Sequence, residues 1–114
     1  MFTHLHVHTE YSLLDGICRL EDLLRRTAEL GMTALAITDH GVMHGVVPFC
    51  RLAHKYGVKP IIGCEVYVAP EGRATRPGPG PDSEPGLRYH HLTLLAEDET
   101  GYRNLLKLVS KGFL

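Results

Sequence analysis

A compact apolar run that passes directly into a polar turn lies in the first half of the chain: Thr33-Ala34-Leu35-Ala36-Ile37-Thr38-Asp39-His40-Gly41. A short, continuous apolar run of this kind is typical of a strand that is buried on both faces of a parallel sheet. The Asp-His-Gly that follows supplies residues that favour a turn. This stretch therefore predicts a buried parallel strand with polar side chains at its carboxyl end.

The segments on both sides of this strand alternate between strand and helix patterns. A helix is predicted from Leu20 to Leu30, because apolar residues recur at helical spacing and Gly31 ends the pattern. The other expected elements are a strand at residues 2–7, a helix at 46–56, a strand at 60–68, a strand-like run at 92–96 and a helix at 100–110. Residues 69–88 contain five Pro and four Gly, a composition that predicts an exposed loop. This order predicts an α/β fold with a parallel sheet, or a segment of a barrel.

Length and composition exclude several classes of protein. The chain has 114 residues and a mass of 12.7 kDa, which is less than half of the roughly 250 residues of a closed β/α barrel. Its 44% hydrophobic content excludes a disordered chain, and its formal net charge of -1 gives no basic field for non-specific DNA binding. Three cysteines without C-x-x-C spacing argue against a disulfide framework, and we expect them to be reduced and buried. Because no secretory leader and no long apolar window is present, we expect a soluble cytoplasmic protein that does not enter a membrane.

Histidine is unusually frequent, with eight in the chain, and two of them stand two residues apart at the end of the first expected strand. Residues i and i+2 of a strand face the same side, so His6 and His8 can share a metal ion. A single histidine on a strand is more often a hydrogen-bonded surface or core residue, but a same-face pair at a strand end favours a metal site. His4 shares that face, and for it a surface or supporting role is favoured.

Carboxylates occupy the other positions of interest. Glu65 lies inside an apolar strand, and a buried carboxylate is costly unless it is paired or bound to a metal; a buried arginine is the alternative partner. Asp39 could hold a neighbouring imidazole in orientation while His40 binds metal, although Asp-His-Gly also fits an ordinary turn. Asp15 by itself fits a turn residue before Gly16.

The remaining histidines give weaker signals. His90 and His91 are adjacent, so only one of them can face a site, and His91 begins its apolar run although a parallel strand carries its site at the end. For His44 and His54, solvated or capping roles are favoured. Imidazoles combined with carboxylates suit zinc, manganese or iron, and several such ligands could bridge two or three ions. A cluster of this kind activates water and clamps phosphate, which favours hydrolysis of phosphoesters.

Four blocks of sequence form a specific set. They are His6-Val7-His8-Thr9-Glu10-Tyr11-Ser12-Leu13-Leu14-Asp15-Gly16, Ala36-Ile37-Thr38-Asp39-His40-Gly41, Lys59-Pro60-Ile61-Ile62-Gly63-Cys64-Glu65, and His91-Leu92-Thr93-Leu94-Leu95-Ala96 with Gly101-Tyr102-Arg103-Asn104-Leu105. Together they resemble the start of the PHP (polymerase and histidinol phosphatase) domain of bacterial DNA polymerase III alpha subunits. The first block resembles the replicative polymerase branch more than the small phosphatases.

The resemblance implies a distorted (β/α)7 barrel with a metal centre at one mouth. Residues 1–114 would be its N-terminal half, a partial PHP domain that stops before the remaining metal motifs. The implied metal ligands are His6, His8, Asp15, His40, Glu65 and His91. The resemblance thus supports Asp15 and His91, for which the local patterns are weak. All six positions carry residues able to bind metal, which favours a lineage that has kept its metal centre.

Three functions are compatible with these patterns. The first is the N-terminal part of a replicative DNA polymerase alpha subunit, whose PHP domain is a metal-dependent phosphoesterase that could remove 3′ nucleotides as a 3′–5′ exonuclease; this part alone is expected to be inactive. The second is a freestanding phosphoesterase for a small phosphate ester, and the third is a non-catalytic scaffold held together by its metals. The first implies DNA and other replisome subunits as partners. Because half a barrel leaves an open sheet edge and an uncovered apolar face, we also expect self-association.

Overall fold

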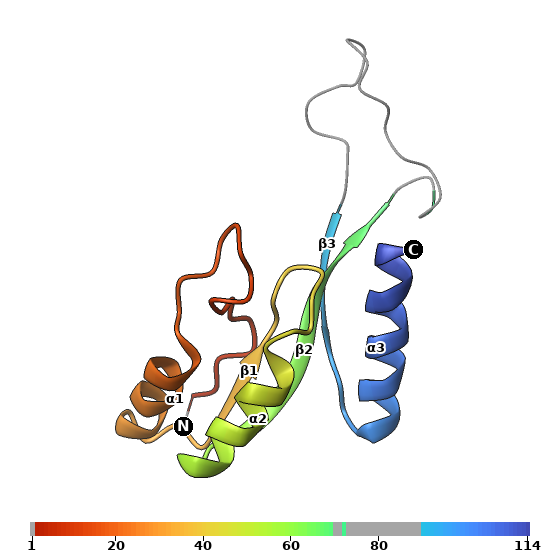
Figure 1. The fold of residues 1–114 in the computed structure, drawn as a ribbon. Coiled ribbons are helices and arrows are strands. Elements are labelled where there is room, and N and C mark those ends of the chain that lie inside the picture. Colours follow the sequence, from red (N-terminus) through yellow and green to blue (C-terminus); the bar gives the residue numbers. More distant parts are fainter. Residues whose placement is uncertain (1, 70–71, 73–89) are drawn as a thin grey trace.

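The computed structural model describes residues 2–69, 72 and 90–114, which form three helices and three strands (Figure 1). In chain order the elements are α1 (Leu20–Glu29), β1 (Ala34–Ile37), α2 (Val46–Lys55), β2 (Lys59–Val68), β3 (His90–Leu95) and α3 (Glu99–Phe113). All six occur where the sequence patterns predict them. The expected loop at 69–88 lies outside the described residues, apart from Ala69 and Gly72.

Local chemistry explains where the helices begin and end. The buried face of α1 consists of Leu20, Leu24 and Thr27, which recur at helical spacing. After α1, Gly31 has a φ of 70°, a left-handed conformation that glycine adopts without steric cost, so the helix ends there. At the start of α3, the Asp98 side chain accepts a hydrogen bond of 2.8 Å from a backbone N–H three residues ahead, which caps the helix.

The three strands form one sheet in the order β1-β2-β3. β1 and β2 are parallel, with Ala34 opposite Lys59 and Ile37 opposite Ile62, so the α/β class and the parallel pairing are confirmed. β3 runs antiparallel to β2, which corrects the expectation that all strands are parallel. A parallel return needs a crossover connection, usually a helix, and the sequence between β2 and β3 is too rich in Pro and Gly to favour one.

The expected first strand, at residues 2–7, is not a regular strand. It lies beside β1, where the Ala36 N–H donates to the His4 carbonyl at 2.9 Å and the Thr38 N–H donates to the Val7 carbonyl at 2.8 Å. The two donors are two residues apart and the two acceptors are three apart, so the pairing shifts by one residue, as at a bulge. The Val7 N–H donates to the Thr38 hydroxyl, at 2.9 Å. The segment is therefore an irregular edge of the sheet.

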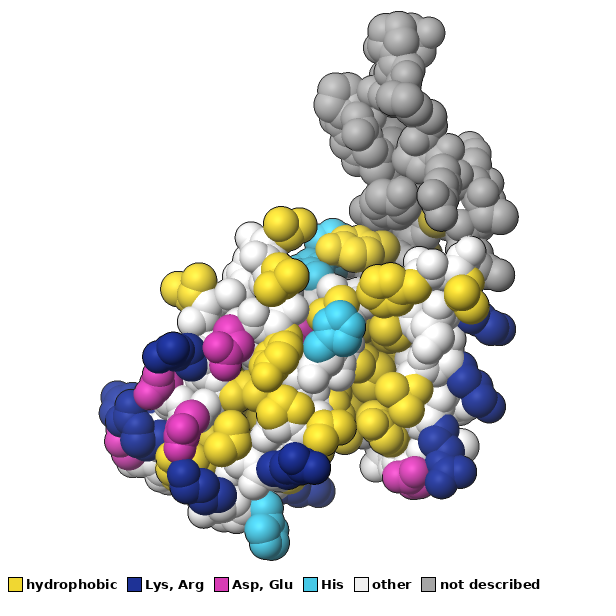
Figure 2. Space-filling model, in the orientation of Figure 1, with side chains coloured by type: hydrophobic (Ala, Val, Ile, Leu, Met, Phe, Trp, Pro, Cys, Tyr) yellow, Lys and Arg dark blue, Asp and Glu magenta, His cyan; other side chains and the backbone are white. Residues whose placement is uncertain are grey.

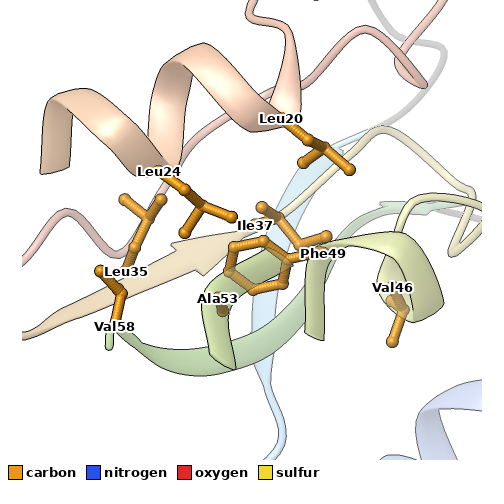
Figure 3. Packing of buried hydrophobic residues seen from close by; sticks show 8 residues of the cluster. All are labelled: Leu20, Leu24, Leu35, Ile37, Val46, Phe49, Ala53 and Val58. Carbon is orange, nitrogen blue, oxygen red and sulfur yellow. The ribbon is translucent and has the colours of Figure 1, made fainter. Parts of the chain in front are cut away.

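The hydrophobic core lies between the sheet and helices α1 and α2 (Figure 3). Its buried members are Leu20, Leu24, Leu35, Ile37, Val46, Phe49, Ala53 and Val58. Side chains alternate along a strand, so Leu35 and Ile37 point into this core while Ala36 and Thr38 point to the other face of the sheet. Continued past the end of β1, the same alternation directs His40 to that other face.

Part of the apolar surface stays uncovered. Figure 2 shows charged side chains gathered over α1 and α3, with a strip of hydrophobic side chains between them. A groove between β2, β3 and α3 is lined by apolar residues that include Val68, Leu92 and Phe113, which are 41%, 47% and 66% exposed. This surface provides the basis for the expected self-association.

The structure also bears on the membrane and the cysteines, for which expectations follow from the sequence. None of the helices that the structure describes is long and apolar enough to span a membrane. The three cysteines are free, and Cys64 is buried as expected. Cys18 is exposed and Cys50 is only partly buried, which differs from the expectation. Cys18 lies outside the core, in the short segment before α1, where it forms an isolated bridge with Thr9.

Candidate metal centre

The carboxyl end of β1 lies beside the middle of β2. The parallel pairing continues past β1 as a bridge between His40 and Glu65. The Glu65 N–H donates to the Asp39 carbonyl at 3.1 Å, and the Gly41 N–H donates to the Glu65 carbonyl at 2.9 Å. His40 and Glu65 are therefore direct neighbours on the face of the sheet that points away from the core.

Glu65 lies at the centre of a cluster of imidazoles. Its side chain is only 6% exposed, and its Oε2 atom lies 2.5 Å from His6 Nε2 and 2.7 Å from His8 Nε2. His40 Nε2 is 3.5 Å from the same oxygen. The other carboxylate oxygen, Oε1, lies 2.8 Å from His91 Nδ1. Four imidazoles from three separate segments thus converge on one buried carboxylate, and they take the place of the buried arginine considered as an alternative.

Asp15 is the second carboxylate of the cluster. Its Oδ2 atom lies 2.7 Å from His40 Nε2 and 3.0 Å from His8 Nδ1, so these two imidazoles connect Asp15 with Glu65. The Ser12 hydroxyl donates to Asp15 Oδ1 at 2.6 Å, and the Asp15 N–H donates to the Ser12 carbonyl at 3.1 Å. Asp15 is therefore a turn residue, as its local sequence indicates, and the turn directs its side chain into the cluster.

Both carboxylates are held in their ionised form. Burial alone would raise the pKa of Glu65, but the hydrogen bonds from three imidazoles outweigh burial and lower its pKa to about 2. The hydrogen bond from Ser12 lowers the pKa of Asp15. The cluster thus carries two negative charges near neutral pH, which favours the binding of cations.

Asp39 contacts the backbone next to a candidate ligand. It is 2% exposed, and both of its carboxylate oxygens accept hydrogen bonds from Thr9, one from the backbone N–H at 2.6 Å and one from the hydroxyl at 2.8 Å. Thr9 directly follows His8 in the chain. Asp39 therefore positions the His8 imidazole by holding the backbone beside it, whereas the sequence pattern suggests direct contact with a ring.

The antiparallel direction of β3 explains the place of His91. His91 is the cross-strand partner of Tyr67, and Thr93 is that of Glu65. Because β3 runs opposite to β2, the beginning of β3 lies at the carboxyl end of β2. From there the His91 side chain reaches Glu65 along the diagonal between the two strands. His91, at the beginning of β3, therefore lies at the same end of the sheet as His40, which follows the end of β1.

The other four histidines lie outside the cluster. They are His4, His44, His54 and His90, and all are exposed. None of them belongs to a group of potential metal ligands within the described ranges. The exposure of His4, His44 and His54 agrees with the surface or solvated roles that the sequence favours for them. Of the adjacent pair His90 and His91, only His91 lies in the cluster, as expected for neighbours on opposite faces of a strand.

Two residues that contribute to the cluster were not singled out from the sequence. Ser12 is 2% exposed, and in addition to holding Asp15 it accepts a hydrogen bond of 3.2 Å from the His40 N–H. The ring of Tyr67 stacks on His40, with ring centroids 5.6 Å apart. Both had a local signal: Tyr67 stands two residues after Glu65 on the same strand face, and Ser12 stands three residues before Asp15 in a turn.

The donor set fits divalent transition-metal ions. Ligand atoms lie within 4.8 Å of one another in three overlapping groups: His6, His8 and Glu65; His8, Asp15 and His40; His40, Glu65 and His91. His8 has a carboxylate oxygen near each ring nitrogen, but a neutral imidazole carries one N–H, so only one of the two contacts can be a hydrogen bond. In the other contact, the lone pairs of a bare ring nitrogen and a carboxylate oxygen repel each other. A second proton on the ring, or a cation between that nitrogen and that oxygen, removes this repulsion. Imidazoles and carboxylates are common ligands of zinc, manganese and iron.

Comparison with known proteins agrees with the fold and the motifs. The family model of the PHP domain matches residues 4–114. The chain is 51% identical over 113 residues to DNA polymerase III subunit alpha of Treponema pallidum, and 52% identical over 116 residues to that of Thermus aquaticus. DNA polymerase III subunit alpha of Deinococcus radiodurans is 52% identical over 118 residues. The alignments cover 98% or 99% of this chain, but the chain spans only 9% of the length of each of these relatives.

Solved structures with the same type of fold are more distant in sequence. A proposed metal-dependent phosphoesterase from Bifidobacterium adolescentis is 24% identical, with a TM-score of 0.53 over 60% of this chain and 24% of that chain. An amidohydrolase from Chromobacterium violaceum, solved with bound sulfate and without metal, is 21% identical, with a TM-score of 0.60 over 92% of this chain and 32% of that chain. At these identities the similarity supports the fold, which is consistent with a part of a barrel. From its fold, its motifs and a family match that runs from residue 4 to residue 114, the chain belongs to the PHP domain family.

Proposed function

We propose that the chain is the N-terminal part of a metal-dependent phosphoesterase domain and that this domain belongs to a replicative DNA polymerase. The observation that carries the proposal is the convergence of His6, His8, His40 and His91 on the buried Glu65 carboxylate. A buried carboxylate surrounded by imidazoles is a costly arrangement for a protein that does not use it. With Asp15, these residues form our proposed ligand set, for two or three ions of zinc, manganese or iron in the complete domain.

The wider role is inferred from similarity. The relatives are DNA polymerase III alpha subunits, of whose length this chain spans 9%, and their names support DNA as the substrate of the whole protein. On this proposal the domain hydrolyses phosphodiester bonds at a DNA 3′ end, the whole protein polymerises DNA in the cytoplasm, and other replisome subunits are its partners. The remaining metal motifs would lie in a part of the domain that follows these residues.

The residues of this chain have separate tasks in that reaction. A divalent ion bound here would supply a Lewis acid and activate water for attack on a phosphoester. Glu65 and Asp15 supply the negative charge that holds cations. Ser12 orients Asp15, while Asp39 and Thr9 hold the backbone beside His8.

The test begins with metal binding by this chain. After dialysis against zinc or manganese, elemental analysis should find close to one ion or more per chain. Less than about a tenth of an equivalent of any transition metal would contradict the proposed centre, because a partial site with several imidazole and carboxylate ligands should retain one ion. In the full-length protein, purified free of other nucleases, His8→Ala should abolish hydrolysis of a single-stranded DNA 3′ end, while His54→Ala should hydrolyse it as fast as the parent.

One observation favours a non-catalytic role as the second candidate. The six ligands come from separate segments of the chain: residues 6–8, the turn at residue 15, the end of β1, β2 and β3. A metal ion bound by them would cross-link these segments and stabilise the fold. If metal raises the melting temperature but the full-length protein does not hydrolyse DNA ends, the scaffold function is supported and the catalytic one is not.

A further inference from the structure

Tyr67 contacts two of the proposed ligands. Its ring stacks on the His40 imidazole, with centroids 5.6 Å apart and planes at 25°, and meets the His91 imidazole edge-on, at 5.1 Å and 84°. The His40 and His91 rings are 5.1 Å apart, at 75°. The three rings therefore form a closed triangle in which each pair lies within the range of favourable aromatic contacts.

The backbone determines where the Tyr67 ring lies. Tyr67 is directly opposite His91 in the antiparallel pair, on the same face as Glu65. A Cβ atom added at Gly41 would lie 3.5 Å from Tyr67 Cε2, so the ring packs on the backbone that follows His40. The tyrosine ring occupies the space directly across from His91. The His91 imidazole therefore extends along the diagonal, where its Nδ1 atom lies 2.8 Å from Glu65 Oε1.

The two imidazoles differ in how firmly other groups hold them. The side chain of His40 is 15% exposed, and its Nε2 atom contacts both carboxylates of the cluster. The side chain of His91 is 52% exposed, and Glu65 is the carboxylate that it contacts. A half-exposed side chain has several rotamers available and loses entropy when it is fixed. His91 therefore depends more than His40 does on the ring of Tyr67.

We propose that Tyr67 is a positioning residue, whose ring holds the His91 imidazole in the orientation for metal binding, with the His40 ring forming the other wall. This inference rests on the proposed function, because it requires that the cluster binds metal. The aromatic ring performs the task, so phenylalanine should replace tyrosine.

Cobalt(II) binding to the 114-residue chain tests this role, because visible absorption reports both the dissociation constant and the ligand set. We expect Tyr67→Leu and Tyr67→Ala to raise the Kd roughly tenfold, the size expected for the loss of two aromatic contacts. Tyr67→Phe should stay within about twofold of the parent chain. Val68→Ala is the matched control, because it is the next residue of β2 and its side chain faces the other side of the sheet. Circular dichroism checks that each variant is folded. If Tyr67→Ala unfolds, Tyr67→Leu still tests the role, because leucine fills much of the volume of the ring.

A double-mutant cycle with His91→Ala separates positioning from general stabilisation. If Tyr67 acts through His91, adding Tyr67→Leu to His91→Ala should raise the Kd by less than about threefold. A full tenfold effect in that background would overturn the inference, as would a parent-like Kd for Tyr67→Leu. A Tyr67→Phe variant that binds as weakly as Tyr67→Leu would assign the effect to the hydroxyl and would also overturn it. A parent chain that binds no cobalt would overturn the proposed function together with this inference, whereas cobalt binding that is equal in the parent and all Tyr67 variants would overturn the inference alone.

Discussion

Replacing Asp39 by alanine should reveal how the fold holds the loop that carries His8. The substitution removes the acceptors of two hydrogen bonds, of 2.6 and 2.8 Å, from the N–H and hydroxyl of Thr9, a residue that is 0% exposed. Each buried polar group left unpaired costs about 1–3 kcal/mol. The loss of a buried carboxylate, which is itself costly to desolvate, offsets part of this. We therefore expect the free energy of unfolding to fall by about 3 kcal/mol.

The measurement is urea unfolding followed by far-ultraviolet circular dichroism. Natural domains are stable by about 5–15 kcal/mol, so the Asp39→Ala variant should remain folded without urea and show an earlier midpoint. Asp39→Asn keeps an acceptor for the Thr9 N–H and should lose only about 1 kcal/mol.

The matched control is Asp98→Ala, which removes one exposed hydrogen bond at the start of α3. Loss of such a helix cap costs about 1 kcal/mol. If Asp39→Ala lowers the free energy of unfolding no more than Asp98→Ala does, then the buried contact with Thr9 is not what holds this loop, and the reasoning is wrong.

Four further predictions concern the turn, the ligands, acid stability and association. A Cβ atom at Gly16 would lie 1.8 Å from the Thr9 carbonyl oxygen, so Gly16→Ala should open the turn. The free energy of unfolding should fall by about 1–3 kcal/mol, and a titration should show weaker cobalt binding. A free energy of unfolding and a cobalt Kd equal to those of the parent would contradict this. His8 contacts both carboxylates, so His8→Ala should raise the cobalt Kd at least about tenfold, whereas His54→Ala, on an exposed position of α2, should match the parent. The pKa of Glu65 is about 2 in the folded chain and 4.5 ordinarily, so its stabilisation is complete above pH 4.5 and is lost as the pH falls toward 2. In metal-free buffer, the free energy of unfolding of Glu65→Gln should therefore fall less steeply than that of the parent chain as the pH drops from 4.5 to 2. Equal slopes for the variant and the parent would count against the assigned pKa. Sedimentation at micromolar concentration should show oligomers, because the apolar groove between β2, β3 and α3 is uncovered; a monomer that binds no hydrophobic dye is the contrary result.

The sequence by itself determined the order of the elements and most of the chemistry of the site. The run from Thr33 to Thr38 predicts a buried strand because continuous apolar residues need cover on both faces, and β1 lies within it. The spacing of His6 and His8 predicts that both face one side, and both reach the same oxygen of Glu65 although their segment is irregular. Glu65 itself was marked by its apolar neighbours, since a charge in such a strand requires a partner. These features depend on neighbours in the chain, so local patterns are sufficient to predict them.

Only the tertiary structure decided which segments meet. A strand pattern has the same period in either direction, so it does not show that β3 is antiparallel, and the place of His91 depends on that direction. An aspartate in a turn has the same local sequence whether its side chain points to water or to a cluster of other side chains. For Asp15, the folded turn directs the side chain toward His8 and His40. The contact between Asp39 and Thr9 joins residues 30 positions apart, which no periodicity links. Hydrogen bonds and aromatic contacts of this kind depend on distances in space, and those are determined only when the whole chain packs its core and satisfies its buried polar groups.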